Sequence, residues 1–123
     1  MTDWPIPNEA GVFSKNEPTC KRYELKGDYK CEADIYVLQV GENEWISNHH
    51  YSTPGSGYGG PLARSHNVFS SEEEAFSQCY SQLKRQLERD ISEAYSDARV
   101  DASKKILTWL ESLVQAKLQP KLF

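Results

Sequence analysis

The sequence contains few cysteines, no long apolar run and no excess of positive charge, and each of these absences excludes a class of protein. Its three cysteines, Cys20, Cys31 and Cys79, form no CxxC pair, so neither a disulfide framework nor a zinc ribbon is predicted. A membrane-spanning helix would require a run of about 18 apolar residues, and the sequence contains no such run. The formal net charge of -4 at pH 7 disfavours non-specific binding to nucleic acid.

The N-terminus and the composition indicate one compact domain in the cytoplasm. The first residues have neither the basic start nor the apolar stretch of a secretory signal. With 123 residues, of which 38% are hydrophobic and 26% charged, the chain has the length and composition of a single globular domain. We expect an α+β fold in which residues 1–19 form an extended lead-in, residues 20–70 a β-sheet and residues 71–118 helix.

Alternating apolar and polar residues predict an antiparallel β-meander of three to four strands. Residues 21–25 and 29–40 alternate on either side of a turn signal at residues 26–28, which is typical of a hairpin. A third alternating run covers residues 44–51. On the second strand one face is predicted to carry Lys30, Glu32 and Asp34. On the third strand one face is predicted to carry Trp45, Ser47, His49 and Tyr51.

Residues 52–61 contain four glycines and two prolines, a composition that predicts a loop rather than a strand or helix. The stretch lacks the Gly-Lys-Ser/Thr ending of a phosphate-binding loop, so no nucleotide cofactor is predicted. A stretch so rich in glycine is either only a flexible connection between strands or a loop whose backbone can adapt to a partner. A short fourth strand is expected at residues 63–69.

A helix is predicted to begin near residue 72. Ser71 and Glu74 have the spacing of a capping box, and Ser70 with Glu73 offers an alternative register. The acidic residues at this point also favour the positive end of a helix dipole.

Apolar residues then recur at helical spacing from Phe76 to Leu113, without a glycine or proline in between. One long helix would overhang so small a sheet, and its apolar stripe predicts a homodimer through the C-terminal helices. We favour the alternative, two helices separated in the polar stretch at residues 96–103, because ordinary helices are shorter. Candidate caps of the second helix are Ser96, Asp97 and Asp101.

No group of residues in the sequence predicts catalysis, a metal site or a cofactor, so we do not expect an enzyme. His49 and His50 are neighbours in a strand and point to opposite faces, which prevents both from binding one ion. Cys79 falls on the buried side of its helix and is predicted to be core rather than a nucleophile. The acidic residues between 72 and 101 are typical of a solvated helix face, with binding to a basic partner surface as the alternative.

A protein-binding surface is predicted around the glycine-rich stretch, because aromatic residues and arginine are enriched at protein interfaces. The candidate contact residues are Trp45, His49, Tyr51, Tyr58, Arg64 and His66. The expected partner is a protein or protein complex, not a membrane and not nucleic acid directly.

The stretch from Trp45 to about Leu87 contains the loop Gly-Ser-Gly-Tyr-Gly-Gly-Pro-Leu and the helix start Ser-Ser-Glu-Glu-Glu-Ala-Phe. It resembles small proteins of phages, plasmids and integrated elements, including anti-CRISPR inhibitors of type I systems, in which a tryptophan strand, a glycine loop and a Glu-rich helix start recur. The resemblance implies a non-enzymatic protein that blocks a host or defence complex by occupying one of its surfaces. An immunity or antitoxin-like protein, which would bind a toxin, is the alternative.

Overall fold

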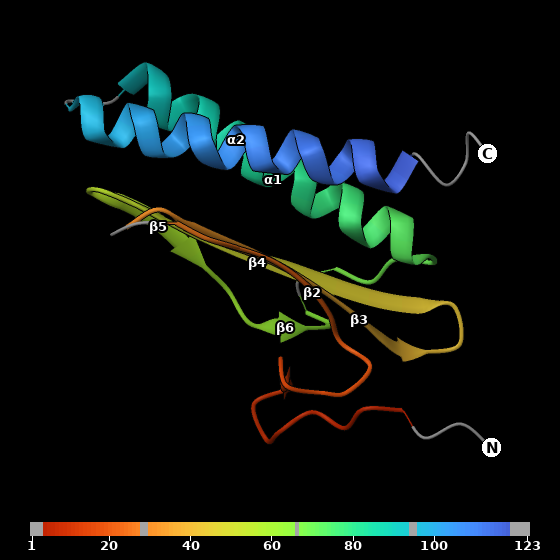
Figure 1. Cartoon of the computed structure of the whole chain (residues 1–123). Helices are drawn as coiled ribbons and strands as arrows, with labels where there is room; N and C mark the ends of the chain where they lie inside the picture. The colour runs from red at the N-terminus through yellow and green to blue at the C-terminus, as the bar shows by residue number, and fades with distance from the viewer. Residues whose placement is uncertain (1–3, 28–29, 66, 94–95, 119–123) are drawn as a thin grey trace.

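The computed structural model of the protein describes residues 4–27, 30–65, 67–93 and 96–118. Two long helices cover one face of an antiparallel sheet, while the N-terminal segment lies against the other face (Figure 1). The elements in chain order are β1 (Val12–Phe13), β2 (Lys21–Lys26), β3 (Glu32–Gly41), β4 (Glu44–Thr53), β5 (Ser56–Gly59), β6 (Leu62–Ala63), α1 (Glu72–Glu93) and α2 (Asp97–Leu118). The predicted α+β fold, a meander followed by helices, is confirmed.

The main sheet has four antiparallel strands in the order β2-β3-β4-β5. The three alternating runs of the sequence correspond to β2, β3 and β4, and β3 is central with its residues 33–38 all buried. The turn between β3 and β4 is tight, since β3 ends at Gly41 and β4 begins at Glu44. Asn43 in this turn has a φ of 59°, in the left-handed region that asparagine tolerates. Strand alternation therefore predicted this part of the fold correctly.

The sequence predicted a loop for the whole glycine-rich stretch at residues 52–61, and this prediction is only partly correct. Its residues Ser56–Gly59 form β5, which pairs with the end of β4. The side chains of Ser56 and Tyr58 both point toward the helices, and the two glycines lie on the opposite face. This alternation of larger residues with glycine lets the stretch continue the meander.

The fourth strand expected at residues 63–69 is also different in the structure. Only Leu62–Ala63 form a strand, β6, and it pairs with β1 rather than with the main sheet. Phe69 makes a single bridge to Trp45 of β4, with N···O distances of 2.7 and 2.8 Å. The described residues between these two points are exposed, so no apolar face holds a longer strand there.

The sheet separates two hydrophobic clusters, because alternate residues of β3 and β4 point to opposite faces. The cluster on the helix side is formed by Cys31, Ala33, Ile35, Val37, Tyr51, Ala75, Phe76, Cys79, Leu83, Leu87, Ala102, Ile106 and Leu110. The cluster on the other side is formed by Phe13, Tyr36, Leu38, Val40, Ile46 and Leu62. The N-terminal segment and β6 therefore cover only the part of that second face where apolar residues lie.

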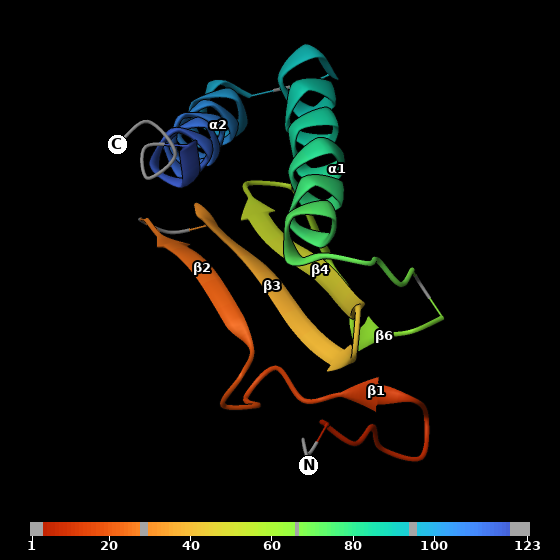
Figure 2. The same ribbon diagram turned by 90° about the vertical axis from the view of Figure 1, so that its right-hand side faces the viewer.

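The helical region consists of two helices, α1 and α2, so the single long helix is excluded. α1 packs on β3, β4 and α2, and the helices lie side by side above the sheet (Figure 2). Ser71 Oγ accepts a hydrogen bond from the backbone N–H of Glu74 (3.2 Å), and Ser96 Oγ accepts one from that of Arg99 (3.3 Å). The predicted cap of α1 is confirmed, and of the three candidate caps of α2 the structure has Ser96 in that role. The overhang from which a homodimer was predicted is not formed.

The periodicity of the sequence predicts a core that includes Ile35, Val37, Leu38, Trp45, Phe76, Tyr80, Leu83 and Leu87, and most of this prediction is confirmed. Ile35, Val37, Leu38, Phe76, Leu83 and Leu87 are buried. Trp45 and Tyr80 pack against the helix-side cluster and remain partly exposed. Neither helix combines the length and the apolar character needed to cross a membrane, within the residues described.

Candidate binding surface

The β4–β5 hairpin is attached to the helix layer by a buried carboxylate. Asp90 of α1 is only 6% exposed. Its Oδ2 accepts hydrogen bonds from the hydroxyl groups of Tyr51 (2.9 Å) and Ser56 (2.7 Å), which lie on β4 and β5. Burial raises the pKa of Tyr51, so its hydroxyl remains a donor at neutral pH. One helical side chain thus joins both strands of the hairpin.

The turn at the tip of this hairpin is held by Arg99 of α2. Its Nε donates to the carbonyl oxygen of Pro54 (2.9 Å), and its Nη2 donates to that of Gly55 (3.1 Å). Gly55 has a φ of 80°, which favours glycine, and a Cβ at this position would lie 2.5 Å from Arg99 Nη2. The turn is therefore held against α2 by two hydrogen bonds, which a partner that reshapes its backbone would have to break.

Two of the predicted contact residues, His49 and Tyr51, are core residues with exposed fractions of 0% and 1%. His49 Nε2 lies 2.7 Å from Gln86 Oε1, and the ring stacks on Tyr58 with the centroids 4.5 Å apart. Burial lowers the pKa of His49, so the ring is neutral at pH 7. A partner cannot reach either side chain, and the expectation that these two residues lie on the surface is wrong.

The remaining predicted contact residues are not gathered into one surface. Trp45 packs against the helix-side cluster, and Tyr58 is half-buried against His49. Arg64 is exposed and supports the β3–β4 turn, where Nη2 donates to the Val40 carbonyl oxygen (3.0 Å). His66 lies outside the described residues. Because Tyr58 contributes to packing, a substitution there would affect folding as well as any binding.

The face of the sheet opposite the helices carries two rows of polar residues where the N-terminal segment does not cover it. Directly paired residues share a face, so each row crosses all four strands. The first row contains Lys26, Glu32, Ser52 and Gly57, and the second contains Glu24, Asp34, His50 and Gly59. We call these eight residues the open face. All except Asp34 are exposed or partly exposed, and both rows end on an exposed glycine of β5.

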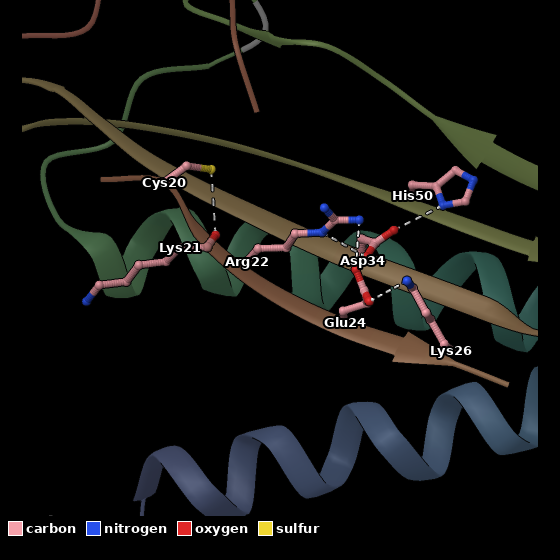
Figure 3. A network of polar contacts seen from close by, with 7 residues as sticks. All are labelled: Cys20, Lys21, Arg22, Glu24, Lys26, Asp34 and His50. Carbon is pink, nitrogen blue, oxygen red and sulfur yellow. Dashed lines mark hydrogen bonds and ion pairs between the residues drawn. The ribbon is translucent and has the colours of Figure 1, made fainter. Parts of the chain in front are cut away.

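Asp34 ties three strands together at the centre of the open face (Figure 3). Its Oδ1 lies 3.3 Å from Arg22 Nε, and its Oδ2 lies 3.5 Å from His50 Nδ1. Arg22 also pairs with Glu24 (2.7 Å), and Glu24 with Lys26 (3.4 Å). These contacts add little to the stability of the fold, because an exposed ion pair contributes about 1 kcal/mol or less.

The sequence predicted the strand faces on which Asp34 and His50 lie, but not that these two residues are in contact. The polar face of β3, including Asp34, was predicted, and His50 was placed opposite His49. The contact could have been predicted from the register between β3 and β4, since Asp34 and His50 are directly paired residues. Alternation defines the face of a residue but not its neighbour on the next strand.

The side chains of the open face are hydrogen-bonding and ion-pairing groups. Within the described ranges, no three His, Cys, Asp or Glu side chains lie close enough to hold a metal ion. Burial raises the pKa of Cys79 to about 11, so its thiol is protonated at neutral pH. The open face offers donors and acceptors of both charges, which suits a complementary protein surface. Comparisons of the chain with protein-family models, with curated proteins and with solved structures find no match.

Proposed function

We propose that this protein is a non-enzymatic inhibitor or accessory protein of a mobile element, and that it binds a host or defence complex stoichiometrically through the open face. The observation that carries the proposal is the array of polar groups of both charges on an exposed sheet face. Charges of both signs on one face can be matched by a complementary protein surface, which gives specificity. An anti-CRISPR role in the cytoplasm, against a type I defence complex, is the version to test first, because the sequence resemblance implies it.

A protein partner fits this surface better than nucleic acid does. The carboxylates of Glu24, Glu32 and Asp34 alternate with the cations of Arg22 and Lys26. Nucleic-acid sites need a net positive field to displace counterions from phosphates, whereas protein interfaces use both signs to fix register. The net charge of -4 acts in the same direction.

The proposal is tested by reversing one charge on each side of the molecule. Glu32→Lys changes the open face, and Glu88→Lys makes the same change at an exposed position of α1. Tagged wild type and both variants are incubated with a purified type I effector complex, and the bound fraction is measured. Glu32→Lys should weaken capture about tenfold, whereas Glu88→Lys should leave it unchanged. Equal capture by both variants would contradict the proposal.

The salt dependence of the binding rates distinguishes long-range attraction between charges from short-range packed contacts in the same complex. If the mixed charges guide encounter, raising the salt concentration should slow association more than it speeds dissociation. Surface plasmon resonance measures both rates. The immunity-protein alternative would be favoured if the protein rescued cells from a toxin, lost this activity on Glu32→Lys, and had no effect on the defence complex. The open face would then still be the binding site.

A further inference from the structure

A polar pocket of about 100 Å³ lies between the sheet and the start of α1, apart from the open face. One wall is rigid because Asn48 is held on both sides. Its Nδ2 donates to the Pro61 carbonyl oxygen (2.8 Å), and its Oδ1 accepts from the Tyr58 hydroxyl (3.2 Å). Phe69, which also lines the pocket, is fixed by its backbone bridge to Trp45.

Three side-chain amides complete the lining: those of Asn67, Gln78 and Gln82. Gln78 and Gln82 are four residues apart on α1, so they project from the same side of the helix. None of the three makes a hydrogen bond to another residue in the part of the chain that is described. Each amide therefore has a donor and an acceptor available to a ligand.

Among the residues that the structure describes, the lining contains no charged side chain, so the pocket favours a neutral polar group. The Cys79 thiol is protonated, and Ser47 Oγ donates to the Ala75 carbonyl oxygen (2.7 Å). A charged group would lose hydration here without gaining a counter-charge. The pocket is also much smaller than the roughly 300–1,000 Å³ typical of small-molecule sites. It has room for one group that protrudes from a larger molecule.

The surroundings of the pocket restrict which larger molecule fits. Phe69 and Gln78 also line an adjoining shallow hollow at the N-terminus of α1, where Glu73 and Glu74 are exposed. These carboxylates repel phosphates and attract a lysine or arginine. A polypeptide with a basic residue beside a neutral amide therefore complements both parts.

We propose that the pocket binds the carboxamide of a Gln or Asn side chain of a partner protein, with a Lys or Arg of the same segment over Glu73 and Glu74. The carboxamide matches the amides because it presents a donor and an acceptor in one plane. This site is separate from the open face, so either proposal can fail without the other.

The probes are two blocked dipeptides that differ in one group, acetyl-Gln-Lys-amide and acetyl-Glu-Lys-amide. Each is titrated into the ¹⁵N-labelled protein, and the side-chain NH₂ signals of Asn67, Gln78 and Gln82 are followed by NMR. The Gln peptide should give saturable shifts with a millimolar Kd, as expected for so small a contact. The Glu peptide should bind about tenfold more weakly, because its carboxylate cannot donate and is repelled.

A pair of matched variants tests the location of the site. Gln82→Leu should weaken binding of the Gln peptide roughly three- to tenfold, the effect of one hydrogen bond. Gln115→Leu, the same change at an exposed position of α2, should not alter it, and neither should Glu32→Lys on the open face. Backbone amide shifts away from the pocket report whether each variant is folded. Equal affinity for the two peptides, or binding of the Gln peptide that is unchanged by Gln82→Leu, would overturn the proposal.

Discussion

Leu83 shows how much of the stability of this protein depends on contact between α1 and the sheet. Its side chain is 0% exposed in the helix-side cluster. Leu83→Ala should lower the free energy of unfolding by about 2–5 kcal/mol, through lost burial and the cavity left behind. Arg85→Ala, at an exposed position on the same helix, should change it by no more than about 0.5 kcal/mol. Urea denaturation measures both, and similar values for the two variants would contradict the described packing.

His49 gives the stability a defined pH dependence. Burial lowers the pKa of this ring in the folded state below the ordinary value of 6.5. As pH falls below about 6.5, the unfolded chain binds a proton that the folded ring does not, so the free energy of unfolding decreases. The loss is at most about 1.4 kcal/mol per pH unit and ends below the folded-state pKa.

The measurement is urea denaturation at several pH values between about 5 and 7, for wild type and His49→Gln. Glutamine can keep a hydrogen bond to Gln86 but does not titrate. The variant should therefore have a flatter dependence of stability on pH, whatever its stability at pH 7. Identical slopes would show that the buried ring is not responsible.

At the scale of elements, the β4–β5 hairpin depends on its helix contacts. Asp90→Ala would leave the hydroxyl groups of Tyr51 and Ser56 without their acceptor, at a cost of about 1–3 kcal/mol. Glu88→Ala, at an exposed position near it on α1, should cost no more than about 0.5 kcal/mol.

Hydrogen exchange can show where the effect of Asp90→Ala is located. The backbone amides of β5 should exchange faster in this variant, because the hairpin opens more often once its attachment is lost. Amides of β3, the central strand, should be affected only through the change in global stability. Uniform acceleration in β3 and β5 would mean that the hairpin and the rest of the sheet open together.

At the scale of the whole molecule, the packing of the helices changes the expectation for assembly. The apolar sides of α1 and α2 face each other and the sheet. The large hydrophobic residues that are exposed in the described chain, Trp4, Ile6 and Val68, lie outside both helices. We therefore expect light scattering at high concentration to give the mass of one chain. A dimer mass that falls to a monomer on Lys105→Glu, at an exposed position of α2, would instead support the homodimer through the C-terminal helices.

Local patterns determined most of the fold. Alternation defined β2, β3 and β4, and the capping residues Ser71 and Ser96 defined where both helices begin. These features were predictable because a strand or a helix start depends on residues close in sequence. Composition suggested a loop for the glycine-rich stretch, and this failed for β5, where two glycines share a regular strand with Ser56 and Tyr58.

The tertiary structure alone decided which faces are covered and which residues meet. His49 and His50 are neighbours in β4, and the local sequence does not tell which of them is buried. The helices bury His49 and leave His50 beside Asp34 on the open face. Asp90 and Arg99 hold the hairpin from positions far along the chain. Periodicity tells which residues share a face, whereas burial of that face depends on distant segments that pack on it. For this reason the sequence by itself determined the elements of the protein, and only the packed chain decided where a partner can bind.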